Sequence, residues 1–66
     1  MELLLLAAIR GAGKHQYEIA EQAGLRESRL SRILRHGGAT AHEREALSAA
    51  LRVEERALFP RDENAA

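Results

Sequence analysis

The sequence predicts an all-α protein, a compact bundle of five short helices. Glycine occurs five times and proline once, and these residues divide the 66-residue chain into short blocks. Apolar residues recur at helical spacing within the blocks, and no block shows the sustained alternation of a strand. The five β-branched residues are too few to favour a sheet. One domain is therefore expected over residues 1–60, with a flexible polar C-terminal tail over 61–66.

The first helix is expected over residues 2–10, with Gly11 as the left-handed residue that follows it. Consecutive leucines at positions 3–6 cover most of its circumference, and so small a bundle cannot bury every side of one helix. We therefore expect one or two of these leucines to contact the last helix or a second subunit. An exposed leucine without any role is also common.

The second and third helices are expected over residues 16–23 and 27–35. The connection between them is very short, and Gly24 there permits a positive φ. Ala20 is small enough to let the third helix cross the second closely. Two short helices joined in this way are typical of a helix-turn-helix, expected over residues 16–36. The expected apolar faces are Ile19, Ala20 and Ala23 on the second helix, and Leu30, Ile33 and Leu34 on the third. Leu25, Leu30 and Ile33 are expected to seal the pair from within.

The fourth helix is expected to begin at Thr40, because Thr40 and Glu43 have the spacing of a capping box. Its inner side is expected to carry Glu43, Leu47, Ala50 and Leu51. The fifth helix is a short turn over residues 54–59, which Pro60 ends.

Composition excludes several classes of protein. The absence of cysteine rules out disulfide scaffolds, cysteine-ligated metals and thiol catalysis. The longest apolar run, residues 3–9, is far shorter than the about 20 residues that span a bilayer. Glu2 also stands where a signal peptide would have a basic start. We therefore expect a cytoplasmic protein without membrane contact.

The histidines and serines do not predict an active site. His15, His36 and His42 lack the spacing of metal ligands, so no metal is expected. Ser28 and Ser31 with His36 would need a buried group to orient the base, and a pocket, and neither is evident. The chain is therefore expected to be no enzyme and to need no cofactor.

Charge is unevenly distributed although the formal net charge is zero. Residues 10–37 carry a net charge of +3 from their Lys, Arg and Glu side chains, whereas residues 38–66 carry −2. A basic segment on an otherwise balanced domain is compatible with binding to DNA.

Residues 16–25, QYEIAEQAGL, followed by LSRI at 30–33, resemble the phage-repressor class of helix-turn-helix domains (the Cro-like, xenobiotic-response-element family). Residues 45–53 and Leu58-Phe59 resemble the family's fourth and fifth helices, so the resemblance covers residues 2–60. It implies a lambda-repressor-like, nucleoid-associated regulator of phage or bacterial transcription. Such a protein binds double-stranded DNA as a dimer on a two-fold operator, with the third helix in the major groove, and is expected to repress.

The face opposite the apolar side of the third helix is expected to carry Ser28, Arg32 and Arg35, with Ser31, Arg29 and His36 on its flanks. Three residues of this helix, Glu27, Ser28 and Arg32, are expected to read bases. Arg32 can bond O6 and N7 of guanine, although a solvated surface arginine is the alternative. Ser28 can bond a base or a phosphate, or belong only to the start of the helix. Glu27 can accept from N4 of cytosine, or simply complement the positive end of the helix dipole.

Six residues are expected to contact the DNA backbone, which fixes register without reading sequence. They are Lys14, Gln16, Arg26, Arg29, Arg35 and His36. The resemblance implies the role of Gln16, because the matching glutamine of the family commonly holds a phosphate. Arg26 and His15 stand where the family usually has a Ser or Thr cap, so Arg26 is expected beside a phosphate or a base. Arg10 is the weakest candidate, since it can simply complement the end of the first helix.

The implied dimer has to form through the bundle itself. The candidate residues are Leu4, Leu5, Val53, Leu58 and Phe59. These would bury little area, so the homodimer is expected to be weak and coupled to DNA. The alternative function is a protein-interaction module with the same fold, either polymerase-binding or antitoxin-like, whose arginine face meets an acidic surface.

Overall fold

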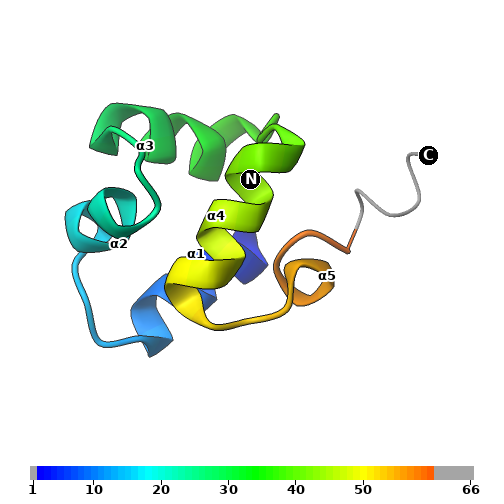
Figure 1. Cartoon of the computed structure of the whole chain (residues 1–66), viewed down its shortest axis with the longest axis horizontal. Coiled ribbons are helices and arrows are strands. Elements are labelled where there is room, and N and C mark those ends of the chain that lie inside the picture. Colours follow the sequence, from blue (N-terminus) through cyan, green and yellow to red (C-terminus); the bar gives the residue numbers. More distant parts are fainter. Residues whose placement is uncertain (1, 61–66) are drawn as a thin grey trace.

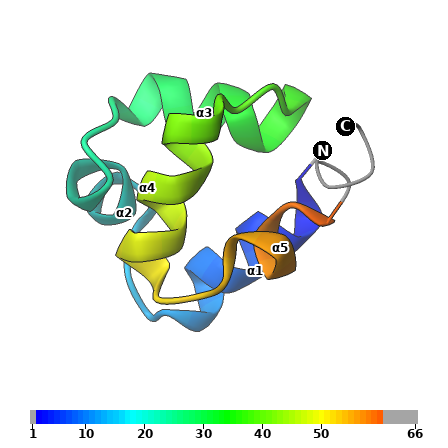
Figure 2. The same ribbon diagram turned by 45° about the vertical axis from the view of Figure 1, so that its right-hand side comes forward.

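Five helices and no strand make up residues 2–60, the part of the chain that the computed structural model describes (Figure 1). They are α1 (Leu3–Gly11), α2 (Gln16–Gln22), α3 (Glu27–His36), α4 (Ala41–Leu51) and α5 (Glu55–Leu58). In Figures 1 and 2, α4 lies between α2 and α5, and α3 runs along one side of the molecule. The prediction of an all-α protein with five short helices is confirmed. The predicted tail over 61–66 lies outside the described residues.

Side chains from all five helices meet in a single core. The largest fully buried ones are Leu5, Ile19, Leu30, Ile33, Leu47 and Leu58. No polar or charged residue is buried among residues 2–60, so apolar packing holds the interior. Each such side chain stabilises the fold by about 1.5–3 kcal/mol. The predicted inner faces of α2 and α3 are therefore correct, apart from Ala23, which is only half-buried.

The end of α1 differs from the prediction. Gly11 is the last helical residue rather than the residue beyond the helix, and Ala12 continues the ladder by donating to the Ala8 carbonyl at 3.0 Å. The left-handed residue is Gly13, with a φ of 70°. Since Gly-Ala-Gly offers two residues that tolerate this conformation, the sequence alone does not decide between them.

The turn between α2 and α3 is a Schellman motif. The Leu25 amide donates to the Ala20 carbonyl at 2.8 Å, and the Gly24 amide donates to the Glu21 carbonyl at 3.1 Å. Gly24 has a φ of 73°, as the sequence predicts for this position. Leu25, half-buried, then packs against the core. This turn sets the direction of α3 relative to α2.

The predicted capping box opens α4. The Thr40 hydroxyl accepts from the Glu43 amide at 3.1 Å, and the Glu43 carboxylate accepts from the Thr40 amide at 2.9 Å. The helix ends at Leu51, and its C-cap Arg52 is a non-glycine residue with a φ of 57°. The Ser48 hydroxyl donates to the Val53 carbonyl at 2.6 Å and holds this exit together. The fifth helix is shorter than predicted because Glu54 and Phe59 are its caps.

Three of the residues expected to form a dimer interface are part of the core. Leu5, Leu58 and Phe59 are 0%, 1% and 2% exposed, so the prediction that they contact a second subunit is wrong. Val53 is half-buried against the same core, and Leu4 is exposed. None of the helices in the described part of the chain is long and apolar enough to cross a membrane.

Candidate nucleic-acid interface

The polar face of α3 is turned outward because its apolar face is held from within. Leu30, Ile33 and Leu34 are buried, and α3 packs against both α2 and α1. The Glu2 amide, at the start of the chain, donates to the Leu34 carbonyl at 2.9 Å. This bond ties the last turn of α3 to the beginning of α1. The face opposite the core is thus fixed in place and open to a partner.

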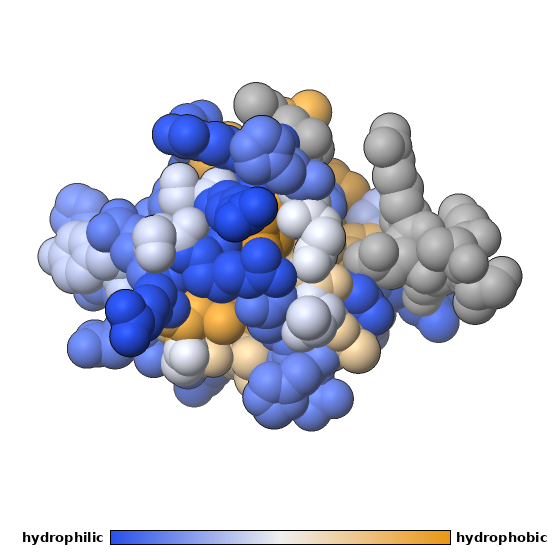
Figure 3. All heavy atoms as spheres, turned by 90° about the horizontal axis from the view of Figure 1, so that it is seen from above, coloured by the Kyte–Doolittle hydropathy of each residue, from blue (hydrophilic) through white to orange (hydrophobic). Residues whose placement is uncertain are grey.

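The outer face of α3 contains a shallow hollow of about 330 Å³. Its lining residues are Ser28, Ser31, Arg32, Arg35 and His36. The spacing of these residues by three and four positions places them along one side of the helix. Figure 3, seen from the side of α3, shows strongly hydrophilic side chains gathered over this face. Because the two serine side chains are short, they leave space beside the arginines for a group that the guanidiniums can bind.

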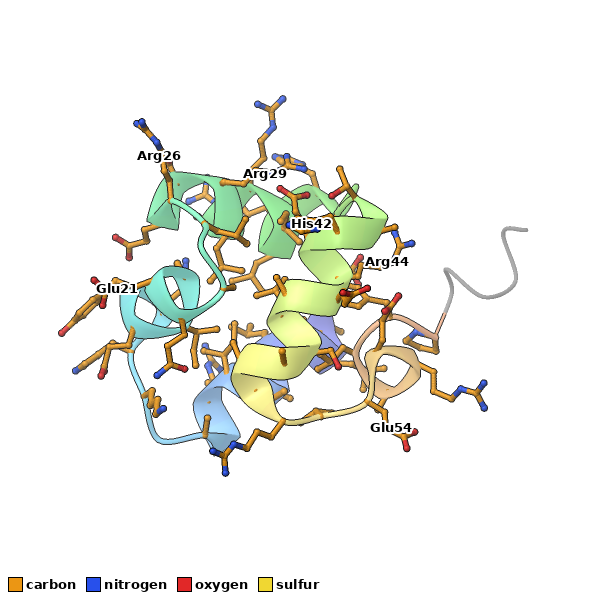
Figure 4. All side chains as sticks on the ribbon, viewed as in Figure 1. Glu21, Arg26, Arg29, His42, Arg44 and Glu54 are labelled. Atoms are coloured by element: carbon orange, nitrogen blue, oxygen red, sulfur yellow. The ribbon has the colours of Figure 1, made fainter. Side chains whose placement is uncertain are left out.

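Arg26, at the start of α3, and Arg32 and Arg35 within it are exposed, and none of their guanidiniums has a hydrogen bond or ion pair within residues 2–60. Figure 4 shows Arg26, the residue before the helix, extending away from the body of the protein. Glu27 is exposed on the first turn beside it. The positive charges of this face are therefore not neutralised by ion pairs within the described chain, and they can attract an anion such as phosphate.

Arg29 is paired with a carboxylate of another helix, Glu43 of α4. Its Nε and Nη2 donate to the two Glu43 carboxylate oxygens at 2.8 and 2.7 Å, and Nη2 also reaches the Gly38 carbonyl at 3.3 Å. The structure thus corrects the expected role of Arg29, since this guanidinium joins α3 to α4 rather than being offered to a phosphate. A bidentate pair of this kind combines two strong, charge-assisted hydrogen bonds with a fixed relative orientation of the two side chains.

The Arg29–Glu43 pair has a clear electrostatic signature. The guanidinium, and then the Thr40 amide, lower the pKa of Glu43 from 4.5 to about 2. The same hydrogen bond raises the pKa of Arg29. Glu43 therefore serves twice, as the acid of the capping box and as the partner of Arg29.

Arg44 joins α4 to the α3–α4 connection and to α5. Its Nη1 donates to the Ala39 carbonyl at 2.8 Å, and its Nε to a Glu55 carboxylate oxygen at 3.2 Å. These contacts join α4 to α5 and hold the segment that leads from α3 into α4. Figure 4 shows Arg29 and Arg44 at the α3–α4 side of the molecule, near His42.

Lys14 and Gln16 lie apart from the hollow on α3. Lys14 lines a second hollow of about 620 Å³, together with Gln22 of α2 and Arg52 at the end of α4. Figures 1 and 2 both place the α1–α2 connection on the side of the molecule away from α3. Gln16 is the half-buried first residue of α2. Of the six residues predicted to bind the DNA backbone, only Arg35 and His36 line the hollow on α3.

Sequence reasoning missed two features of this site. It placed Ser31 on the flank of the helix, although Ser31 lines the hollow on α3. The signal was present, because Ser31 lies three positions after Ser28 and four before Arg35. It also assigned Glu43 to the capping box and to the inner side of the fourth helix but not to a pair with Arg29, since no local pattern marks a pair separated by 14 residues.

No group of three or more His, Cys, Asp or Glu side chains within residues 2–60 is placed to hold a metal ion. Comparison of the chain with models of protein families, with curated proteins and with solved structures finds no match. The site has therefore to be interpreted from its own geometry.

Proposed function

We propose that this chain is a helix-turn-helix regulator of the phage-repressor, lambda-repressor-like class, which binds double-stranded DNA sequence-specifically. The observation that carries the proposal is the outer face of α3, where Arg32 and Arg35 line a hollow with two serines and their guanidiniums have no partner within residues 2–60. A basic helix face backed by a rigid core suits an elongated anionic partner.

The dimensions support insertion of α3 into the major groove. An α-helix with its side chains is about 10–12 Å across, and the major groove of B-DNA is about 12 Å wide. In this arrangement Arg32 and Ser28 read base edges, and Glu27 accepts from a cytosine. Arg26, Arg35 and His36 hold phosphates on either side. Arginine and glutamate at these positions predict G·C pairs in the half-site.

The proposed mode of action is occupancy. A dimer bound to two half-sites blocks polymerase or a competing protein, which makes the regulator a repressor. The domain needs no ligand or chemical step for this role.

The test is a selection of binding sites from a randomised duplex pool at near-physiological salt. We expect a two-fold symmetric site with G·C pairs to be enriched by the wild-type protein. Arg32→Ala is expected to lose that enrichment, whereas Arg10→Ala, the same charge change on the last turn of α1, is expected to retain it. Failure of the wild-type protein to enrich any sequence contradicts the proposal and favours an acidic protein partner, as in a polymerase-binding or antitoxin-like regulator.

A further inference from the structure

Two exposed leucines form an apolar patch on the first turn of α1. Leu3 is 64% exposed and Leu4 is 52% exposed, and with Tyr17 they are the exposed large hydrophobic residues of the described chain. Ala7, one turn later, is exposed as well. A single exposed leucine is ordinary, but two adjacent ones in so small a protein form a surface that water solvates poorly.

The patch lies beside the end of α3. The hydrogen bond from the Glu2 amide to the Leu34 carbonyl joins the residue before Leu3 to the last turn of α3. Figure 2 shows the start of α1 close to that end of the helix. A partner that covers the leucines therefore approaches the proposed DNA-binding helix from its C-terminal end.

Charges of both signs border the patch. A Glu2 carboxylate oxygen lies 3.1 Å from where a Cβ on Gly37 would be, so the acid lies against the end of α3. Arg35 and His36 are exposed on the same last turn. A surface that carries an acid and bases side by side is self-complementary, because a two-fold axis places the acid of one copy near the bases of the other.

We propose that a second copy of the chain packs its own Leu3 and Leu4 against these leucines about a two-fold axis. Each copy buries much less than the about 800 Å² per partner of a standard stable interface. The dimer is accordingly weak in solution and is strengthened when both copies bind one DNA molecule.

The spacing of the two α3 helices rests on the proposed function. α3 has 10 residues, which corresponds to a length of about 15 Å. Half-sites one turn apart lie about 34–36 Å from each other. With the two α3 helices on one line, this spacing requires the two-fold axis to pass about one helix width beyond the end of α3.

Sedimentation of the DNA-free protein up to millimolar concentration tests the interface. The test variant is the double substitution Leu3→Glu with Leu4→Glu, and Tyr17→Glu on α2 is the matched control. Both variants leave the core intact, which circular dichroism melting verifies. We expect the average mass of the wild type and of Tyr17→Glu to rise toward a dimer, while the leucine variant stays monomeric. A monomeric wild type, or a leucine variant that associates like the wild type, overturns the proposal.

DNA titrations keep this proposal separate from the proposed function. On a duplex with one half-site, the leucine variant is expected to bind as the wild type does. On the two-fold site it loses the cooperative gain. Leucine-dependent dimers that bind no duplex would contradict the DNA-binding function and still support the interface. DNA binding that shows no leucine dependence in cooperativity would contradict the interface alone.

Discussion

Arginines on the outer face of α3 and at the α3–α4 junction have the same charge but different surroundings. Arg26, Arg32 and Arg35 extend from α3 without an acidic partner within residues 2–60. Arg29 and Arg44 instead donate to Glu43, Glu55 and nearby backbone carbonyls. The first group is available to bind a partner, and the second holds the helices that present it.

Arginine density on a helix therefore does not identify a binding residue. Arg29 and Arg32 are three positions apart on α3, yet only Arg29 lies opposite a carboxylate of another helix. Substitutions that separate binding from stability test this distinction.

The largest effect is expected for DNA affinity. Replacing Arg32 and Arg35 together by alanine is expected to weaken specific binding about 100-fold, because base and phosphate contacts are both lost. The melting temperature should not change, since neither side chain has a partner in the described protein. Fluorescence anisotropy with the selected duplex measures the affinity. The reverse pattern, in which Tm falls and affinity is retained, would show that these arginines are structural.

Glu43→Gln is expected to lower the free energy of unfolding. Water reaches this part of the surface and screens the pair, so the loss of stability at pH 7 is smaller than the pKa shift of Glu43 alone would suggest. Arg29→Ala should lower the thermal stability in the same direction, and the double variant should lose less than the sum of the two. Urea titration gives the values. Strict additivity would mean that the pair does not couple α3 to α4.

The same pair predicts a pH dependence. The pKa of Glu43 is about 2 in the folded protein and 4.5 ordinarily, so the unfolded state binds the proton more readily. The stabilisation is complete above pH 4.5 and is lost as the pH falls toward 2. Thermal melts of the wild type and Glu43→Gln should therefore converge in acid. An offset between them that stays constant down to pH 2 would be inconsistent with this origin.

A substitution in the turn between α2 and α3 is expected to have a smaller effect on the free energy of unfolding, and the sign of that effect is known. Gly24→Ala is expected to destabilise by about 1 kcal/mol, because alanine resists a positive φ. The cost is conformational, since a Cβ there meets nothing within 4 Å. Gly11→Ala, at a helical position that is equally open, should be neutral or stabilise by up to about 0.5 kcal/mol. Equal effects of the two changes on the midpoint of urea unfolding would argue against the turn as described.

The smallest effect is on salt dependence. If Arg35 contacts a phosphate, Arg35→Ala should reduce the slope of log affinity against log salt by about 1. Arg10→Ala should leave the slope unchanged. An unaltered slope for Arg35→Ala would remove it from the set of phosphate-binding residues.

Local patterns predicted most of the fold. The apolar spacing of Leu30, Ile33 and Leu34 and the capping box at Thr40 are set within a few residues, and both are present in the structure. The end of α1 was misplaced because Gly11 and Gly13 are locally equivalent.

The candidate site was only partly predictable. Helical geometry placed Ser28, Arg32 and Arg35 on one face, where the structure has them. Arg29 pairs with Glu43, and Lys14 lines a different hollow from α3. Both features depend on how α4 packs against the other helices. Burial of Leu58 and Phe59 depends likewise on how α5 docks. No sequence period encodes such contacts between distant segments.

The outer face of α3 is the surface that we propose binds duplex DNA. Titration of the isotopically labelled protein with a random-sequence duplex at low salt, followed amide by amide in a nitrogen–proton correlation spectrum, tests it most directly. We predict that the largest shifts occur from Arg26 through His36 and decrease as salt is added. Shifts absent from α3, or confined to the hollow around Lys14 and Arg52, would show that α3 is not the DNA-binding helix.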